Sequence, residues 1–563
     1  MPRFNIKFIT MIKENLVELF VNSIKENWEN PAFTDYFDKK TFTYQQVAER
    51  VAELHLLFDK LNVQKNDKIS LVGKNGSSWC ITYIATVTYG AVVVPMLQDF
   101  PPENLTNIIN HSDSKLLFTS DYIWTKLNAE ELPNIESAIS LENFECIFAK
   151  DKKSEEYIAN AQNAFNEKYP SGYTKDDIKY AEVPNSNLVC LSYTSGTTGF
   201  SKGVMLTANN FAGNITFGIT TKMVHKKKVL SFLPLAHAYC CAFDFLTSFC
   251  DGTHTTYLGK MPAAPLLMKA LSDIKPDIIF TVPLIIEKVY KKKLQPIINK
   301  PYMKVLMSLP FIKKVIGVKI HYQLKNAFGG KFDQMVIGGA PLNHEVEAFL
   351  RKIRIPYTVG YGMTECAPLI SYSHWKEYKE TSVGKILPNM EVKIMSNDPY
   401  KEIGEILVRG ENVMAGYYKN EEATNAALDA DGWLHTGDMG YIDTDNNIYI
   451  RGRNKSMLLS ANGQNIYPEE IEAKLNNMPY VAESVVVQNK AAKLIALVYP
   501  DKDAMKADKV SEKALAKIMD KNKRHLNKQI AAYEQITEIR IHATEFEKTA
   551  KKSIKRFLYS VDD

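Results

Sequence analysis

The sequence predicts an α/β fold: a large N-terminal domain of layered α/β sheets with a small β subdomain, followed by a small, mobile α+β domain. The 563 residues exceed what one hydrophobic core normally supports, so two or more domains are expected. Short apolar runs that end in glycine-rich or polar loops alternate with helical stretches, which is typical of layered α/β sheets. The pattern shifts to short strands and turns after about residue 370, and it changes again after Arg453.

The clearest helix is predicted near the N-terminus, in the segment TFTYQQVAERVAELHLLFDKL. Thr43 and Gln46 have the spacing of a capping box. Apolar side chains recur at helical spacing on one face, at Val47, Val51, Leu54, Phe58 and Leu61. We therefore expect an amphipathic helix that packs on the core through this face.

Five apolar runs are the predicted strands that carry the chemistry. They are LVCLSYTSG, VLSFLPLAH, IIFTVP, MVIGGAP and YTVGYG. Ligands of open α/β sheets collect beyond the carboxyl ends of the strands. The polar loops that follow these runs are therefore the expected site.

The remaining part of the chain predicts a β subdomain and a second domain. EVKIMSNDPYKEIGEILVRG and GYIDTDNNIYIRG indicate short strands with turns between about residues 370 and 450. Beyond them, ESVVVQNKAAKLIALVYP predicts paired strands, a lysine-rich helix follows, and ITEIRIHA predicts a further strand. The expected domains are 1–452, which is the N-terminal domain, and 453–563, which is the mobile C-terminal domain.

Composition narrows the class of protein. Hydrophobic residues at 45% and charged residues at 24% are typical of a soluble globular protein, and a net charge of +5 is too small to indicate a nucleic-acid partner. The seven cysteines are odd in number and form no CxxC pair, which argues against a disulfide framework or a zinc site; Cys240 and Cys241 are expected to be small buried apolar residues. Lys7 and Lys13 interrupt the apolar N-terminus, and no window approaches the roughly 18 apolar residues of a membrane span, so a soluble or peripheral protein is expected.

The strongest motif is YTSGTTGFSKG, which directly follows the apolar run LVCLS. Its glycines let the backbone turn and approach a ligand closely, and its hydroxyl groups and lysine suit phosphate oxygens. The spacing is not that of a Walker loop. A flexible linker is the alternative, which the preceding buried strand and the lysine disfavour. The candidate phosphate-binding residues are Thr194, Ser195, Gly196, Thr197, Thr198, Gly199 and Lys202.

This loop resembles the phosphate loop of the adenylate-forming, AMP-binding superfamily, although Ser201 stands where many members have proline. The resemblance continues in the same order along nearly the whole chain. FLPLAHAY implies that His237 lies by the substrate carboxylate. VIGGAPL implies that the backbone of Gly338, Gly339 and Ala340 borders adenine.

Three later motifs complete the implied site. GYGMTE, with Gly360, Gly362 and Met363 at the nucleotide, implies that Tyr361 stacks on adenine, that Thr364 binds the α-phosphate, and that Glu365 holds magnesium together with Thr194. Asp438 in GWLHTGDMG and Arg453 in RGRNKSMLLSANGQNIYPEEIE are the implied ribose contacts. In that last motif, Lys455 is the implied hinge, and Gly463 is the glycine that lets pantetheine pass. Taken singly, His237 fits a structural histidine, Asp438 a turn residue and Glu365 a capping acid. Only their order along the chain favours the functional interpretation.

The C-terminal lysine departs from the superfamily pattern T-x-x-x-K-x-x-R. Aligned on Thr549 and Arg556, the lysine position holds Ser553. Lys552 is expected to supply the missing charge, with Lys555 as the second candidate. A long, flexible lysine side chain on a loop can place its ammonium group at the position of a neighbouring residue's side chain. The alternative is that these lysines are solvated surface residues and that catalysis is slower.

Two features indicate a long-chain acid. TVPLIIEKVYKKKLQP is similar to a segment of long-chain fatty acyl-CoA synthetases, with Leu284 in place of the usual arginine. The region Lys288 to Lys331 then contains many lysines and no acidic residue, interleaved with apolar runs. Such a stretch suits a membrane surface or the passage of an anionic lipid. A solvated helical insert with a buried apolar side fits equally well.

The resemblance implies a long-chain fatty acid–CoA ligase that uses ATP, Mg²⁺ and coenzyme A. Fatty acid and ATP would give acyl-AMP and pyrophosphate, and coenzyme A would then take the acyl group and release AMP. Two alternatives stay open: an acyl-AMP ligase or acyl-ACP synthetase with another acceptor, and a nucleotide- or lipid-binding protein that has lost catalysis. The expected location is cytoplasmic, with peripheral contact at the inner face of the membrane as an open possibility.

Overall fold

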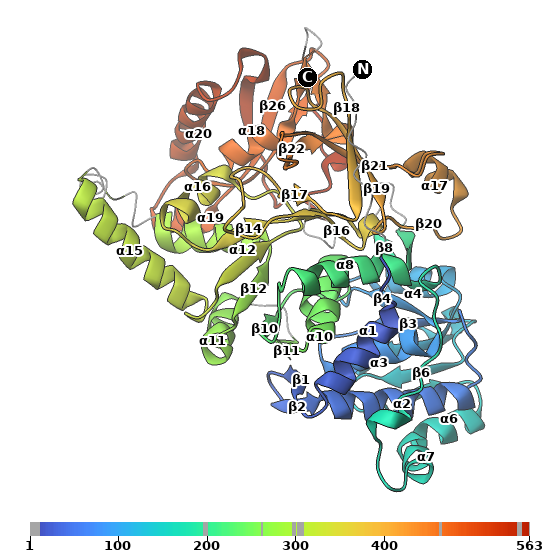
Figure 1. Cartoon of the computed structure of the whole chain (residues 1–563). Helices are drawn as coiled ribbons and strands as arrows, with labels where there is room; N and C mark the ends of the chain where they lie inside the picture. Colours follow the sequence, from blue (N-terminus) through green and yellow to red (C-terminus); the bar gives the residue numbers. More distant parts are fainter. Residues whose placement is uncertain are drawn as a thin grey trace.

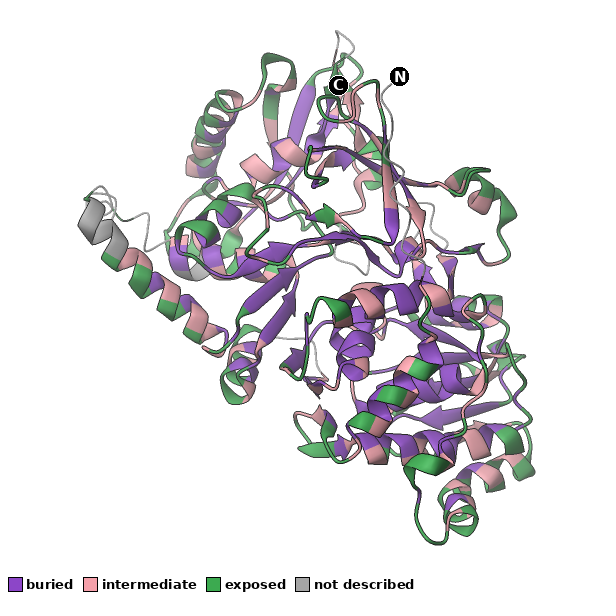
Figure 2. Ribbon diagram, viewed as in Figure 1, coloured by how far each residue is buried: buried purple, intermediate pink, exposed green. Residues whose placement is uncertain are grey.

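The computed structural model describes residues 12–194, 201–259, 263–295, 300, 309–460, 464–548 and 554–561. Two large sheets form most of the N-terminal part; the β subdomain and the C-terminal part lie at the top of Figure 1, and the second large sheet lies at the lower right. The strands of both large sheets are mostly buried (Figure 2).

The first large sheet holds four of the five predicted strands as neighbours. Its order is β14 (Tyr357–Val359), β13 (Gln334–Ile337), β12 (Ile278–Thr281), β10 (Lys228–Ser231), β11 (His254–Tyr257), β1 (Pro31–Asp35) and β2 (Lys40–Thr43). All neighbours are parallel except β1 and β2. The carboxyl ends of β10, β12, β13 and β14 therefore meet along one edge, as expected for a parallel sheet.

The fifth predicted strand belongs to the second large sheet. The order there is β20 (Gly416–Tyr417), β9 (Lys202–Thr207), β8 (Leu188–Thr194), β4 (Val92–Met96), β3 (Lys68–Val72), β5 (Ser114–Thr119), β6 (Ser137–Ser140) and β7 (Cys146–Ala149). Strands β8 and β9 form an antiparallel hairpin whose ends flank the predicted phosphate loop. The sequence pattern alone does not separate this strand from the other four.

The two large sheets share the helix α3 (Ser77–Tyr89). It contacts β1 of the first sheet and β3 and β4 of the second. Eleven of its thirteen residues are buried, and an all-round apolar surface is typical of a helix enclosed on every side. Gly90 ends the helix with φ of 89°, a left-handed conformation that glycine adopts without a steric cost.

The predicted N-terminal helix is confirmed as α2 (Tyr44–Lys60). The Thr43 hydroxyl accepts from the Gln46 backbone N–H, and the Gln46 side chain accepts from the Thr43 backbone N–H. All five residues of the predicted apolar face are buried. The ring of Phe249 lies 4.8 Å from that of Tyr44 in α2 and 5.3 Å from that of Phe33 in β1. This ring therefore joins α2 to the first sheet.

The β subdomain and the C-terminal part also follow the predicted pattern. An antiparallel sheet has the order β18 (Met390–Met395), β19 (Gly404–Gly410), β21 (Leu434–Ile442) and β22 (Ile448–Arg453). The C-terminal strands β25 (Val481–Gln488) and β26 (Leu494–Pro500) pair antiparallel, and β27 (Ile536–Ile541) adds in parallel. The helices α18 (Pro468–Leu475) and α20 (Glu512–Asn527) pack on this sheet over a separate apolar cluster.

The basic region contains the helix α15 (Pro310–Ala327), which extends away from the body of the molecule (Figure 1). Ile320 and Leu324 are buried, whereas Val315, Val318 and Tyr322 are at least half exposed. The helix therefore has a buried apolar side and an exposed apolar side. In the described residues, no helix is both long enough and apolar enough to cross a membrane.

All seven cysteines are free, and Cys240 and Cys241 are buried as predicted. Both thiols lie among apolar side chains of the main core.

The capping box generates a prediction about α2. Replacing Thr43 with alanine removes the acceptor of the Gln46 N–H, and the loss of an N-cap typically costs about 1 kcal/mol. The first turn of α2 should then open about five-fold more often, which hydrogen exchange of Tyr44–Ala48 measures. The control is Thr43→Ser, which keeps the hydroxyl. Equal protection of this turn in the alanine and serine variants would contradict the capping role.

Candidate active site

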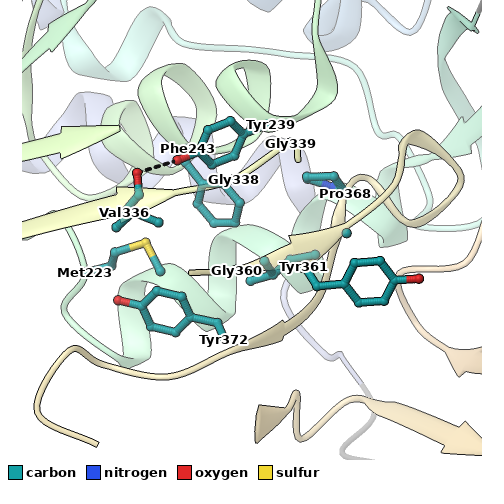
Figure 3. Close-up of a pocket in the computed structure, with 12 residues that line it drawn as sticks. Met223, Tyr239, Phe243, Val336, Gly338, Gly339, Gly360, Tyr361, Pro368 and Tyr372 are labelled. Carbon is teal, nitrogen blue, oxygen red and sulfur yellow. Dashed lines mark hydrogen bonds between the residues drawn. The ribbon is translucent and has the colours of Figure 1, made fainter. Parts of the chain in front are cut away.

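Five predicted nucleotide residues line one cavity, of about 50 Å³, at the edge where β13 and β14 end. They are Gly338, Gly339, Gly360, Tyr361 and Gly362. Apolar side chains from other elements close the cavity, among them Tyr239, Phe243 and Met223 (Figure 3). The first sheet and the strand β15 (Tyr361–Gly362) thus bring together residues that the sequence places in two separate motifs.

Tyr239 forms one wall of this cavity and follows the predicted residue His237 by two positions. Its hydroxyl donates to the backbone carbonyl of Val336 at 3.1 Å (Figure 3). A Cβ atom at Gly338 would lie 3.2 Å from the Tyr239 ring, so the ring packs directly on glycine backbone. The glycine therefore keeps the cavity wall in place by its small size.

A second, smaller cavity gathers other predicted residues. His237 and Thr364 line it together with Ser192 and Tyr193 at the end of β8. Thr364 begins a short 3-10 helix, η5 (Thr364–Cys366), and its side chain is buried. The cavity lies between segments of both large sheets, so the site is built where the ends of the two sheets meet.

Asp438 is a buried carboxylate with two partners. Arg453 lies directly opposite on β22, with its Nε 3.0 Å from Oδ1 of Asp438. The Tyr361 hydroxyl donates to Oδ2 at 2.7 Å, and its ring is directed away from Tyr239 and Phe243 (Figure 3). Burial raises the pKa of Asp438, and the Arg453 guanidinium and the Tyr361 hydroxyl act against that rise. The three residues form one hydrogen-bonded group beside the first cavity.

Glu365 lies beside a tyrosine that the sequence analysis did not identify. The Tyr417 hydroxyl donates to Oε1 of Glu365 at 2.9 Å. The backbone N–H of Met414 donates to the Glu365 carbonyl at 2.8 Å. A carboxylate and the hydroxyl of Thr194 are oxygen ligands of the kind that Mg²⁺ prefers, so these two residues fit the implied metal.

Several predicted site residues lie outside the described part of the chain. They are Ser195, Gly196, Thr197, Thr198, Gly199, Gly463 and Lys552, and Ser553 and Thr549 lie there too. Of the phosphate motif, the structure describes Thr194 at the end of β8 and Lys202 at the start of β9, which pair across the hairpin. Ala340 and Met363 follow β13 and β15 in the described part.

The C-terminal residues of the lysine motif are held within the C-terminal part. Lys555 has its Nζ 3.4 Å from Oε2 of Glu547. Arg556 bonds to the buried carboxylate of Glu472 on α18. Lys455 is exposed in the 3-10 turn η6 (Asn454–Ser456), directly after β22. The hinge role of Lys455 and the charge-supplying role of Lys555 stay predictions.

Tyr417 and Tyr239 are the residues at this site that sequence reasoning missed. Neither has a diagnostic spacing. The signal for Tyr239 is its place two residues after His237, and that for Tyr417 is its place in the short run GYYK after an apolar strand.

Comparison with known proteins identifies related sequences. A model of the AMP-binding enzyme family matches residues 20–418, and a model of the AMP-binding enzyme C-terminal domain matches residues 455–560. The long-chain-fatty-acid–CoA ligase ACSBG1 of Rattus norvegicus is 26% identical over 497 residues, which cover 82% of this chain and 66% of that protein. FadD15 of Mycobacterium tuberculosis, also named a long-chain-fatty-acid–CoA ligase, is 26% identical over 492 residues, or 82% of this chain and 78% of that protein. The match thus spans just under two thirds of the rat relative.

Solved structures confirm the predicted fold class. The anthranilate CoA ligase AuaEII, in complex with anthranoyl-AMP, has a TM-score of 0.76 and 19% identity, with coverage of 97% of this chain and 96% of that chain. The o-succinylbenzoate CoA synthetase MenE from Bacillus subtilis, in complex with ATP and a magnesium ion, has a TM-score of 0.72 and 21% identity, with coverage of 96% and 98%. At these identities the likeness shows the fold.

The π-helix η3 (Cys241–Thr247), whose Phe243 lines the first cavity, also carries a buried carboxyl group at Asp244. The side chain is 1% exposed, and neither oxygen has a hydrogen-bond partner among the described residues. Burial raises its pKa to about 8, and the nearby Ser231 hydroxyl acts against that rise. Asp244 is therefore protonated in the folded protein over a wide range of pH.

Asp244 generates a prediction about pH and stability. Its folded pKa of about 8 lies above the ordinary value of 3.8, so the folded state keeps a proton that the unfolded state has released. The stabilisation is complete below the ordinary pKa and is lost as the pH rises through about 8, at up to about 1.4 kcal/mol per pH unit. Asp244→Asn, which stays neutral, should flatten this decline when thermal unfolding is followed between about pH 5 and pH 8. The exposed control Asp176→Asn should leave the decline unchanged. An equally steep decline in Asp244→Asn would contradict the assignment.

Proposed function

We propose, since the chain belongs to the family of AMP-binding enzymes, that it is a long-chain fatty acid–CoA ligase. It would join fatty acid and ATP into acyl-AMP with release of pyrophosphate, and then transfer the acyl group to coenzyme A with release of AMP. The observation that carries this proposal is the group of Tyr361, Asp438 and Arg453 beside a glycine-walled cavity. The names of the sequence relatives support the acid and the acceptor.

The nucleotide would lie along the edge where β13 and β14 end. The backbone of Gly338 and Gly339 would border the adenine, and Asp438 would accept hydrogen bonds from the ribose hydroxyls. A buried carboxylate suits this role because it accepts several hydrogen bonds from neutral hydroxyl groups. Arg453 supports the role by pairing with the carboxylate from the exposed side.

The chemical step brings a carboxylate to the α-phosphorus, so negative charge approaches negative charge. The protein needs no nucleophile of its own, and it acts by holding the reactants in line and by neutralising charge. His237 and Thr364 line the second cavity and would position the fatty-acid carboxylate and the α-phosphate there. Glu365 and Thr194 would hold Mg²⁺, which neutralises phosphate charge when it is bound.

The apolar cavity favours an apolar acid. Tyr239, Phe243 and Met223 line the same cavity as the glycines that would border the adenine, so the acyl chain would lie next to the nucleotide. The flexible methionine is suited to adapting its position to the chain that enters. The proposal of a long-chain acid is supported by the names of the relatives, which are long-chain-fatty-acid–CoA ligases.

Thiol transfer and membrane contact are further parts of the proposal. Lys455 would be the hinge, and Gly463 would leave room for pantetheine as the C-terminal domain turns. The exposed Val315, Val318 and Tyr322 on the lysine-rich helix α15 would contact a membrane surface, from which a long-chain acid could enter.

A single assay separates the proposed ligase activity from the alternatives. The protein is incubated with ATP, Mg²⁺ and a panel of acids of increasing length, with and without coenzyme A, and pyrophosphate and thioester are measured. Thioester from long-chain acids is expected. Pyrophosphate release that coenzyme A does not alter, with no thioester, would indicate another acceptor, and the absence of both products would contradict ligase activity.

The metal role of Glu365 gives a direct prediction. Glu365→Ala should lower adenylate formation by about 10²–10³-fold, because a charge contact to the reacting phosphates is lost. The measurement is acid-dependent pyrophosphate release, with the fold checked by circular dichroism. Glu391→Ala is the matched control, since this glutamate pairs with Arg409 in the β subdomain. A rate in Glu365→Ala equal to that of the control would remove the metal assignment.

The missing lysine gives another prediction. Lys552→Ala should slow acyl-AMP formation and spare thioester formation from supplied acyl-AMP, because the lysine loop would face the site only during adenylation. Lys555→Ala is the second candidate, and Lys551→Ala is the neighbouring control. If no lysine now supplies the charge, Ser553→Lys should raise adenylation about ten-fold or more. A large gain in Ser553→Lys without a loss in Lys552→Ala or Lys555→Ala would contradict the substitution of one lysine for another.

A further inference from the structure

The segment Gly416–Lys419 contacts both parts of the candidate site, the phosphate-binding candidate Lys202 and the metal-binding candidate Glu365. Its strand β20 pairs with β9 in the register Gly416 with Met205 and Tyr417 with Val204. The Tyr418 N–H donates to the Gly203 carbonyl at 2.8 Å. This short strand therefore runs along the hairpin that carries the phosphate loop.

Tyr417 contacts two residues of opposite charge. Its hydroxyl donates to Oε1 of Glu365 at 2.9 Å, and the Nζ of Lys202 lies over its ring at 4.8 Å from the centroid. The side chain is buried, with 9% of its surface exposed. One rigid side chain thus separates a carboxylate from an ammonium group.

The backbone around Tyr417 is fixed on both sides. The Tyr417 N–H donates to the hydroxyl of Thr424 on α17 (Glu421–Ala427) at 2.9 Å. Lys419 forms an ion pair with Asp113 at 2.7 Å, and the Tyr418 hydroxyl donates to the same carboxylate at 3.0 Å. These contacts tie the segment to the end of α4 (Pro102–His111) and to β5. The tyrosine ring consequently has little freedom to change its position.

The placement has a physical consequence for a site that binds a charged ligand. A lysine and a glutamate at neighbouring positions tend to pair and neutralise each other. In the part of the chain that the structure describes, Glu365 and Lys202 each contact Tyr417, and they form no ion pair with each other. Tyr417 occupies only one oxygen of the carboxylate, Oε1, and it meets the ammonium through the ring face. The second carboxylate oxygen and the N–H donors of the lysine therefore keep capacity for a ligand.

We propose that Tyr417 is a positioning residue that holds Glu365 and Lys202 apart, so that the carboxylate serves a divalent cation and the ammonium serves the phosphates of ATP. This inference rests on the proposed function. It gives the two halves of the side chain different tasks. The hydroxyl orients the metal ligand, and the ring orients the phosphate-binding lysine.

The two tasks separate in two variants. Tyr417→Phe removes the hydroxyl and keeps the ring, so ATP binding without a divalent cation should stay unchanged while the Mg²⁺ concentration needed for half-maximal binding rises about ten-fold. Tyr417→Leu removes both contacts, so ATP binding should weaken about ten-fold even without the cation. Isothermal titration calorimetry of ATP at graded Mg²⁺ concentrations measures both quantities without turnover.

The control is Tyr480→Phe. Its hydroxyl donates to Asp508 at 2.9 Å, the same distance as in the Tyr417–Glu365 bond, but it lies on the C-terminal domain. Wild-type Mg²⁺ dependence in Tyr417→Phe would overturn the proposal, as would an equal loss of ATP affinity with and without Mg²⁺. Wild-type protein that binds no ATP would instead contradict the proposed function. Because Tyr417→Phe removes one oxygen atom, a wild-type circular dichroism spectrum is expected, and the variant tests the inference even where Tyr417→Leu loses its fold.

Discussion

The buried carboxylate of Asp438 is the constraint on which the nucleotide side of the site depends. A buried charge must be paired and hydrogen-bonded, and Arg453 and Tyr361 meet that requirement. The bond from Tyr361 joins residues 77 positions apart, and the Arg453 contact joins neighbouring strands of the β subdomain. One carboxylate therefore fixes the position of β15 relative to the β subdomain, and with it the wall of the first cavity.

The same pairing places the site next to the predicted domain junction. Arg453 is the last residue of β22, and Lys455 follows it in the turn η6. A ligand that bonds to Asp438 would act on the strand that leads into the C-terminal part. The proposed rotation of that part and the proposed nucleotide contact thus share a single β-hairpin. This arrangement offers a direct physical route by which the state of the nucleotide could bias the orientation of the small domain.

Local patterns in the sequence were sufficient for much of the fold. The capping box at Thr43, the apolar face of α2 and the strands β10, β12, β13 and β14 all follow from spacing, because each depends on neighbours in the chain. The assignment of β8 to another sheet did not follow, since buried parallel and hairpin strands have the same apolar composition. The long-range hydrogen-bond partners of single side chains could not be predicted from the sequence either.

In the candidate site, too, local motifs could be predicted from the sequence, whereas contacts between distant segments could not. Tyr361 and Asp438 were identified from separate motifs, but their hydrogen bond is set by the packing of the β subdomain on the first sheet. Tyr417 and Asp244 carry no motif, and their placement depends on which strand pairs with β9 and on the π-helix η3. The described residues position Thr194, Lys202, His237, Thr364 and Glu365, while most of the phosphate loop and Lys552 lie outside them.

The central claim, that a fatty-acid carboxylate attacks the α-phosphorus of ATP, is tested most directly by following the carboxylate oxygen. A long-chain acid whose carboxyl group carries heavy oxygen is converted to thioester, and the products are analysed by mass spectrometry. The oxygen that bonds to phosphorus stays with the nucleotide when the thiol attacks the acyl carbon. AMP that contains one heavy oxygen atom per thioester is therefore the predicted result. Heavy oxygen in pyrophosphate or orthophosphate, with unlabelled AMP, would contradict the adenylate mechanism.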